Sequence, residues 1–333
     1  MAEQNNIIEY AHFNKSILGY ETVDDKTKLS IHIDSEFQNY LKDHVFGGES
    51  FVPATMIIEL LFEAAFYYCE KTMKMNVAEL KPIMLKNFDI QRALKMKPGD
   101  SIDADFIYNS VEEKEDGTVL FDIEIASNRL SASKKVVGRR VNVKSKVVIG
   151  KNVYPAPDFK IPDEHYNYYQ LNKANFYKTY FPSLGKLFQT AHAKFAVNDE
   201  RTHYIAEYNC DNNEASFIQG QTSHFITSPL GNDSTLQAAV FFSRMINLIG
   251  RLPVGGEELY FYRKHPLDSD MHVYVEKVDI DDNMTCNIYS YDKNGVVFSA
   301  KNFVVGRSPY HKLLDRETFE KDISTQTSEP FDL

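Results

Sequence analysis

Residues 53–69 read PATMIIELLFEAAFYYC, and residues 233–249 read DSTLQAAVFFSRMINLI. Both stretches are apolar on most sides at helical spacing, and Pro53 stands where the missing N–H of a first helical turn does no harm. Asp233 and Ser234 are natural N-cap residues for the second helix. A helix that is apolar nearly all round must be wrapped by other structure, because its polar stripe is too narrow to face water. We therefore expect two buried helices.

The segments that follow these two helices also resemble each other. Residues 80–109 and 113–127 after the first, and residues 252–280 and 284–306 after the second, alternate apolar and polar side chains. An alternation of period two is typical of antiparallel strands, and Gly-containing turn signals separate the runs. The sequence predicts several antiparallel strands after each helix.

Equivalent positions in the two segments keep a nearly constant offset. The separation is 180 positions from Thr55 to Thr235 and 172 positions from Leu80 to Leu252. A steady offset indicates a duplicated unit of a strand, one long buried helix and then several antiparallel strands.

The duplication predicts a division into four parts, with Pro-containing polar sequence between the units. The parts are a first unit at residues 1–150, a linker at 151–170, a second unit at 171–315 and a polar tail at 316–333.

The composition is that of an ordinary globular protein. The chain has 333 residues, 43% of them hydrophobic, and a net charge of -10, which argues against general nucleic-acid binding. Three widely spaced cysteines form no metal or disulfide pattern. The apolar run around residues 57–68 is too short and too charged to span a membrane, and the N-terminus has no signal pattern. We expect a cytoplasmic protein.

One stretch departs from the acidic balance. Residues 129–146 contain seven Lys and Arg side chains and no acid. The first interpretation is the solvated face of two strands and their turn. The second is a docking patch for an acidic partner.

One motif lies immediately before the first helix, and another lies at the start of the second. The sequence DHVFGGESFVP at residues 43–53 fits HxxxGxxxxP, with His44, Gly48 and Pro53 in place, and Asp233 with Gln237 fits DxxxQ. Both resemble the signatures of polyketide and fatty-acid synthase dehydratase domains. Residues 184–189 (LGKLFQ), with Tyr177 upstream, resemble that family's YGPxFQ block. Residues 252–263 resemble its LPxxI…YR stretch, so the resemblance covers roughly residues 31–306.

The resemblance implies an α+β double hot-dog fold, in which each of two tandem units wraps a curved antiparallel sheet around a long central helix. It implies dehydration of a β-hydroxyacyl thioester by a hydro-lyase, with His44 as base and Asp233 as acid. Imidazole suits the removal of an α-proton, and a carboxylic acid held in its protonated form suits the departing hydroxyl. Gln237 would orient Asp233, and Tyr177 would lie near both.

Substrate contacts are expected at Gly48, Pro53, Tyr177 and Gln237. The turn at residues 48–53 is a natural source of backbone N–H groups that polarise the thioester carbonyl. The chain departs from the family at Ala54, Phe181, Leu184, Lys186 and Ser228, which we expect to line the acyl channel or its rim.

We expect no metal, nucleotide or other cofactor, since no motif for one is present and the substrate would be carried on the phosphopantetheine of an acyl carrier protein. The expected partner is that acidic carrier, docking near Arg139 and Arg140 to a discrete enzyme acting in trans; no nucleic acid or membrane partner is expected, and a homodimer is compatible with the sequence. Three alternatives stay open. They are a cyclase of the same fold (product-template or pyran-forming), a double-bond isomerase, which Asp233 disfavours, and a non-catalytic carrier-binding protein.

Overall fold

The computed structural model describes residues 10, 12–23, 26–130, 135–220, 225–266, 269–310 and 315–324. The helices are α1 (Phe13–Ser16), α2 (Ala54–Lys71), α3 (Lys173–Tyr180), α4 (Pro229–Asn247) and α5 (Arg316–Ser324), with short 3-10 turns at Asn39–Leu41, Val77–Glu79, Lys186–Phe188 and Asp211–Ser216. The strands of the first half are β1 (Ile17–Val23), β2 (Lys26–Asp34), β3 (Val45–Phe46), β4 (Glu49–Phe51), β5 (Lys81–Ile90), β6 (Lys95–Met96), β7 (Ser101–Glu113), β8 (Val119–Leu130) and β9 (Val136–Gly150). Those of the second half are β10 (Tyr166–Gln170), β11 (Ala191–Asn198), β12 (His203–Asn209), β13 (Arg251–Phe261), β14 (Asp270–Ile280), β15 (Met284–Asp292) and β16 (Gly295–Arg307).

One antiparallel sheet runs through both halves of the molecule. Within the described residues it has 13 strands in the order β1-β2-β7-β8-β9-β5-β13-β16-β15-β14-β12-β11-β10. The two halves meet where β5 pairs with β13, with Leu85 opposite Leu259. Outward from this junction, the order β5-β9-β8-β7-β2 is matched by β13-β16-β15-β14-β12. The two halves expected from the sequence repeat therefore have the same order of five strands, counted outward from their junction.

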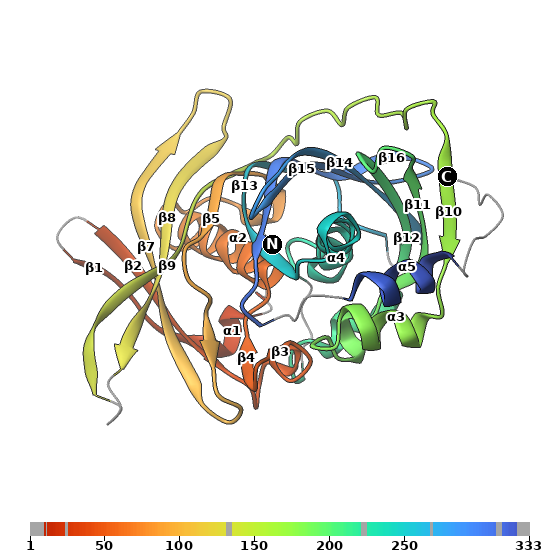
Figure 1. Cartoon of the computed structure of the whole chain (residues 1–333). Helices are drawn as coiled ribbons and strands as arrows, with labels where there is room; N and C mark the ends of the chain where they lie inside the picture. The colour runs from red at the N-terminus through yellow and green to blue at the C-terminus, as the bar shows by residue number, and fades with distance from the viewer. Residues whose placement is uncertain are drawn as a thin grey trace.

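The two long helices lie inside the curves of this sheet. Figure 1 shows α2 enclosed by the first half of the sheet and α4 by the second. The helices also contact each other, and most of their side chains are buried. This arrangement is the double hot-dog fold that the sequence predicts. None of the helices in the described ranges has the length and apolar run needed to cross a membrane.

Helix α4 begins four residues earlier than the sequence indicated. Its first residue is Pro229, so the prediction that Asp233 and Ser234 cap it is wrong. The fixed φ of proline starts the helix, and the Glu214 carboxylate accepts the N–H of Leu230 at 2.8 Å in place of a capping side chain. Asp233 consequently lies in the second turn of α4, where its side chain is buried.

Two segments expected to be irregular contain regular structure. The last five residues of the predicted linker form β10, which pairs with β11. The first nine residues of the predicted tail form α5, and residues 325–333 lie outside the described part of the chain. Both assignments depend on tertiary contacts: Tyr169 of β10 stacks on Phe195, and Phe319 of α5 packs on Tyr180.

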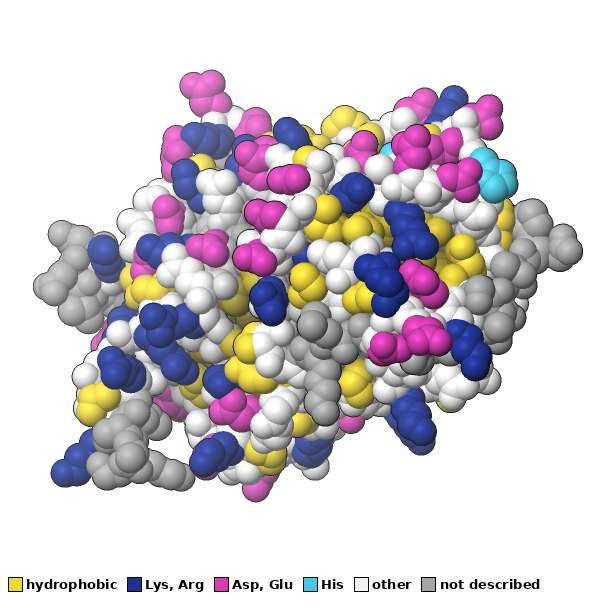
Figure 2. Space-filling model, in the orientation of Figure 1, with side chains coloured by type: hydrophobic (Ala, Val, Ile, Leu, Met, Phe, Trp, Pro, Cys, Tyr) yellow, Lys and Arg dark blue, Asp and Glu magenta, His cyan; other side chains and the backbone are white. Residues whose placement is uncertain are grey.

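Of the basic stretch at residues 129–146, residues 129–130 end β8 and residues 136–146 form the first part of β9, which pairs with β8. Figure 2 shows Lys and Arg side chains gathered over this part of the surface. Neighbouring strands supply acids that the stretch itself lacks: Arg139 pairs with Asp105 at 2.8 Å, and Lys144 with Glu124 at 2.9 Å. Lys134 lies outside the described residues. The positive charge of this surface is therefore partly neutralised.

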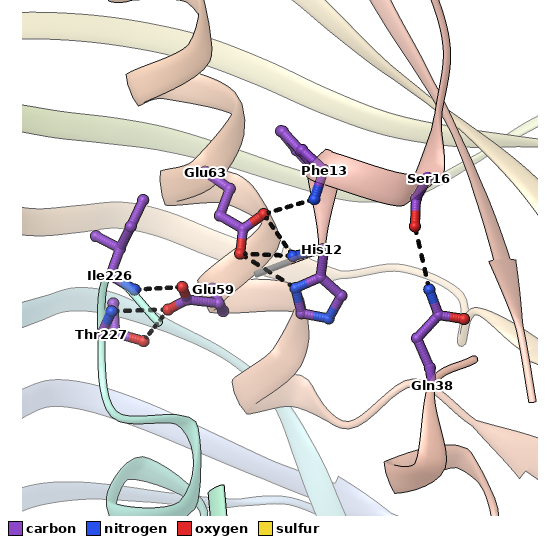
Figure 3. A network of polar contacts seen from close by, with 8 residues as sticks. All are labelled: His12, Phe13, Ser16, Gln38, Glu59, Glu63, Ile226 and Thr227. Carbon is purple, nitrogen blue, oxygen red and sulfur yellow. Dashed lines mark hydrogen bonds and ion pairs between the residues drawn. The ribbon is translucent and has the colours of Figure 1, made fainter. Parts of the chain in front are cut away.

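Helix α2 carries two fully buried carboxylates, Glu59 and Glu63. Glu63 accepts the backbone N–H groups of His12 and of the next residue at 3.2 Å, and it lies 3.2 Å from His12 Nδ1 (Figure 3). Glu59 accepts the N–H of Ile226 at 2.5 Å and both the N–H and the hydroxyl of Thr227, at 2.7 and 2.5 Å. Burial and the charge of Glu63 raise the pKa of Glu59. These acids fasten the N-terminal segment and the approach to α4 onto α2.

Candidate active site

His44 lies where the two halves of the chain meet. It forms an isolated antiparallel bridge with Leu184 of the second half. Its Nδ1 lies 3.0 Å from the carbonyl oxygen of Phe51. Because a carbonyl only accepts, Nδ1 carries the proton and Nε2 is left as the basic nitrogen. Burial lowers the pKa of His44 to about 4, so the ring is neutral near pH 7.

A tight turn between β3 and β4 brings Phe51 back to His44. Gly47 and Gly48 adopt φ values of +58° and +81°, a region that glycine enters without steric cost. The N–H of Phe51 also donates to the carbonyl of His44 at 3.0 Å. Gly48 itself lies at the exposed tip of this turn, and Pro53 is the residue directly before α2. Both shape the loop that holds His44.

Asp233 is held from the side by Gln237, one helical turn further along α4. Gln237 Nε2 donates to Asp233 Oδ2 at 2.6 Å and to the carbonyl of Phe188 at 2.8 Å. The Phe188 carbonyl fixes which end of the amide is the nitrogen, because it only accepts. Burial raises the pKa of Asp233 to about 7, and the hydrogen bond from Gln237 opposes that rise.

Tyr177, on α3, contacts the side of Gln237 that faces away from Asp233. Its hydroxyl accepts the N–H of Ala191 at 2.8 Å and donates to Gln237 Oε1 at 3.1 Å. Burial raises the pKa of Tyr177 well above its usual value, so the phenol stays protonated. The tyrosine thus reaches Asp233 through Gln237 and fixes the amide that holds the carboxyl group.

His44 and Asp233 both line one cavity of about 230 Å³. Gln237 lines it as well, whereas Gly48, Pro53 and Tyr177 are not part of its wall. Most of the wall is apolar and comes from both halves, including Phe46, Phe51, Val52, Ile57, Leu236 and Val240. An apolar wall with a few polar groups is typical of small-molecule sites.

The departures from the family motifs divide into two groups. Ala54, Phe181 and Leu184 line the cavity as expected, but Lys186 and Ser228 do not. Ser228 is buried directly before α4, where its hydroxyl accepts the N–H of His265 at 3.1 Å. The expectation that Lys186 and Ser228 border the acyl channel is therefore wrong. Ser228 lies away from the cavity wall because α4 starts directly after it, and its side chain makes no capping hydrogen bond to that helix.

The turn at residues 48–53, expected to supply N–H groups that polarise the thioester carbonyl, is not suited to that role. The N–H groups of Phe51 and Val52 are already donated to the carbonyls of His44 and Leu94, and Pro53 has none. The first turn of α2, which begins at Ala54 on the cavity wall, instead carries N–H groups without partners inside the helix.

Three basic residues of the wall, Arg92, Arg251 and Arg307, were missed by the sequence interpretation, and two of them are exposed. Arg92, just after β5, and Arg307, the last residue of β16, both line the cavity. Neither belongs to a motif, and they are 215 positions apart in the sequence. Their common place on the cavity wall could have been predicted only from the strand order of the sheet.

The arrangement is suited to paired proton transfer. A neutral imidazole can accept a proton at Nε2, and a protonated carboxyl group can deliver one. Both groups are in these states between about pH 4 and pH 7, given their shifted pKa values. Within the described residues, no group of three or more His, Cys, Asp or Glu side chains is placed to hold a metal ion.

Solved structures of similar fold are dehydratase domains. A trans-AT polyketide synthase dehydratase domain from Brevibacillus brevis is 18% identical, with a TM-score of 0.64 over 90% of this chain and 99% of that one. The dehydratase domain from the CurF module of curacin polyketide synthase is 15% identical, with a TM-score of 0.61 over 91% and 100%. The dehydratase domain of PpsC from Mycobacterium tuberculosis, in complex with C12:1-CoA, is 13% identical, with a TM-score of 0.61 over 88% and 98%.

No family model matches the sequence, and no curated protein sequence matches it. The chain has the double hot-dog fold of polyketide synthase dehydratase domains, and the resemblance found in its motifs is confirmed at the level of the fold. At identities of 11–18%, the likeness establishes the fold, so the activity is argued from the site.

Proposed function

We propose that this protein dehydrates a β-hydroxyacyl thioester, carried on an acyl carrier protein, to the α,β-unsaturated thioester. The observation that supports this most directly is a neutral base and a protonated acid, one from each half of the chain, lining the same apolar cavity. The dehydratase domains of similar fold support it as well.

In the proposed reaction, His44 Nε2 removes the proton on the carbon next to the thioester carbonyl. The electron pair of that C–H bond forms the new double bond, and the C–O bond to the β-hydroxyl breaks. Asp233 gives its proton to the departing oxygen, which leaves as water. The imidazolium and carboxylate that result return to their starting states when one proton passes from His44 to Asp233. The first-turn N–H groups of α2 would polarise the carbonyl and so acidify the α-proton.

The test uses a β-hydroxyacyl pantetheine thioester and measures the unsaturated product. His44→Ala should abolish turnover, and Asp233→Asn should leave at most residual activity, because each removes one of the two proton-transfer groups. His165→Ala is a matched control, since that histidine is largely exposed and is not part of the cavity wall.

The proposal fails if the His44 and Asp233 variants dehydrate the thioester at near wild-type rates while remaining folded. Turnover should also persist after chelation and dialysis, as no cofactor is proposed. Analysis of products from a substrate with a second hydroxyl group distinguishes dehydration alone from ring closure.

We further propose that the carrier protein docks near Arg139 and Arg140. Both bodies would be acidic overall, and they repel on approach unless a local basic surface reverses the field. The ion pairs of Arg139 with Asp105 and of Lys144 with Glu124 partly neutralise this surface, whereas Arg140 donates to the uncharged hydroxyl of Ser127 and keeps its positive charge unbalanced by that contact.

Reversal of Arg139 and Arg140 to Glu tests this docking site. The double variant should lose more activity with the carrier-bound substrate than with the pantetheine thioester, and added salt should act in the same direction. Equal losses with both substrates would indicate damage to the fold, and no loss with either would remove the docking proposal.

A further inference from the structure

The loop at residues 183–189, called the bridging loop below, reaches both proposed proton-transfer groups. The ring centroids of Phe188 and His44 are 5.5 Å apart, so the loop packs on the base. The carbonyl of Phe188 accepts from Gln237 Nε2 at 2.8 Å, and the same nitrogen donates to Asp233. A shift of this loop would therefore act on the base through a side chain and on the acid through the backbone.

The two neighbours of the proposed base in the sequence hold the bridging loop. The carbonyl oxygen of Asp43 accepts the N–H of Gly185 at 2.7 Å, and its Oδ2 accepts the N–H of Leu187 at 2.8 Å. Val45 donates its N–H to the carbonyl of Ser183 at 3.1 Å. Only one of these contacts uses a side chain, and it is the one made by the Asp43 carboxyl group.

This side-chain contact satisfies the start of a 3-10 turn. The turn spans Lys186–Phe188, and its N-cap is Gly185, which has no side chain to accept an N–H group. The first N–H groups of a helical turn have no partner inside the turn. Asp43 supplies an acceptor from the other half of the chain. The bridging loop therefore depends on Asp43 for a contact that its own sequence does not provide.

The Asp43 side chain also packs directly on the loop backbone. A Cβ atom at Gly185 would lie 2.3 Å from Cγ of Asp43 and 2.5 and 2.6 Å from its two oxygens, closer than a real side-chain carbon can come. Gly185 has a φ of -73°, which any residue can adopt. The glycine is thus required by the close approach of Asp43, and the fit between the two is specific.

We propose that Asp43 is a positioning residue that sets the place of the proposed acid, Asp233, relative to the proposed base, His44. Its carboxyl group fixes the residue before Phe188, and Phe188 fixes Gln237. This inference rests on the proposed function, because it takes the two groups to act on one substrate. Asp43 is not part of the cavity wall, so its effect on the reaction is indirect.

Loss of the Asp43 side chain should separate the two proton transfers. His44 would keep its hydrogen bond to the carbonyl of Phe51, so Nε2 would still be able to remove the α-proton. With Asp233 out of place, the C–O bond would stay intact, and the proton on Nε2 would return to the same carbon. In D2O the proton on Nε2 exchanges with solvent, so a deuteron would return instead. The substrate would then gain deuterium without losing water.

The experiment follows a β-hydroxyacyl pantetheine thioester in D2O and measures two rates by mass spectrometry. They are the incorporation of deuterium at the α-carbon of the recovered substrate and the formation of the unsaturated product. In Asp43→Ala, dehydration should fall about 10–100-fold, since a misplacement of about 1 Å can have an effect of this size. The ratio of deuterium incorporation to dehydration should rise by about tenfold or more.

Three further variants complete the comparison. Asp43→Asn keeps an oxygen that can accept the N–H of Leu187, so its ratio should stay close to that of the wild type. Gly185→Ala pushes the loop away from Asp43 and should raise the ratio, which keeps the test available if Asp43→Ala does not fold. Asp116→Ala is the matched control: this aspartate also accepts a backbone N–H, that of Thr118 at 2.9 Å, but it lies outside the cavity wall.

A loss of folded protein lowers both rates by the same factor and leaves their ratio unchanged. An unchanged ratio in Asp43→Ala would therefore overturn the proposal at any level of activity, as would an equal rise in Asp116→Ala. If the wild type neither exchanged nor dehydrated the thioester, the proposed reaction would fail, and NMR of the Gln237 side-chain amide would decide the positioning role. Its signal should move in Asp43→Ala and stay in place in Asp116→Ala, and an unmoved signal in Asp43→Ala would overturn that role.

Discussion

Replacement of Gln237 by Leu should move the alkaline limb of the pH–activity profile to higher pH and leave the acidic limb in place. The side chain donates to Asp233 at 2.6 Å and so opposes the rise in the pKa of that carboxyl group to about 7. A hydrogen bond to a charged group contributes about 1.5–3 kcal/mol. Since 1.36 kcal/mol corresponds to one pKa unit, the pKa of Asp233 should rise by about one to two further units. Asp233 is almost fully buried, so solvent should screen little of this effect.

The assay is kcat/KM for a β-hydroxyacyl pantetheine thioester across the pH range, because this parameter reports the pKa values of the free enzyme. In the wild type, activity should rise as pH passes about 4, where His44 loses its proton, and fall as pH passes about 7, where Asp233 loses its own. In the Gln237→Leu variant, the alkaline fall should move to about pH 8–9, while the acidic rise stays in place. The variant should also be less stable by roughly 1–3 kcal/mol for each partner left without a hydrogen bond, here the Phe188 carbonyl and the Tyr177 hydroxyl.

Tyr177→Phe is the matched control, because it removes the hydrogen bond to the far end of Gln237 and leaves the contact with Asp233. Its alkaline fall should stay near pH 7. An unchanged or lowered alkaline limb in Gln237→Leu would show that the limb does not report Asp233, and the assignment of Asp233 as acid would have to be withdrawn.

Three further substitutions test how the fold supports the site. Gly255→Ala should cost about 1–3 kcal/mol of unfolding free energy in a denaturant titration, because its Cβ would lie 2.3 Å from the carbonyl oxygen of Phe88 at the junction of the halves; a wild-type midpoint would contradict this. Gly185→Ala should lower kcat more than stability, since its Cβ would lie 2.3 Å from the carboxyl group of Asp43, the neighbour of His44, the proposed base; unchanged turnover would count against the geometry of that loop. Glu63→Gln should speed amide hydrogen exchange in residues 12–16, because an NH2 group replaces one of the two carboxylate oxygens that accept backbone N–H groups. Exchange as slow as in the wild type would show that Glu63 is not needed to hold this segment.

The elements set by local pattern could be predicted from the sequence. Period-two alternation predicted the strands that follow each long helix, and two apolar stretches predicted α2 and α4, because burial imposes these patterns directly. The motifs led to His44 and Asp233, which the structure places on one cavity. Features that depend on distant partners could not be predicted in this way.

The start of α4 shows why. A local N-cap was expected at Asp233, but the carboxylate of Glu214 serves the helix terminus from another segment. The charges in the apolar run at residues 57–68 counted only against a membrane span. One of them, Glu59, is fully buried and accepts three hydrogen bonds from Ile226 and Thr227. That Arg92 and Arg307 line the same cavity likewise depends on the strand order of the whole sheet. A sequence pattern carries no information on which residue far along the chain will face a given side chain.

The junction of β5 with β13 has a consequence for how the protein reaches its active form. Leu85 and Leu259 are opposite each other across this junction, 174 positions apart in the sequence. Bringing such distant strands together requires the closure of a long loop, and contacts of this kind slow folding. During synthesis from the N-terminus, the first half must therefore wait with β5 as an open edge until β13 has been made. An open edge of this length is a site for aggregation, so expression at low temperature or with a chaperone should raise the yield of folded chain.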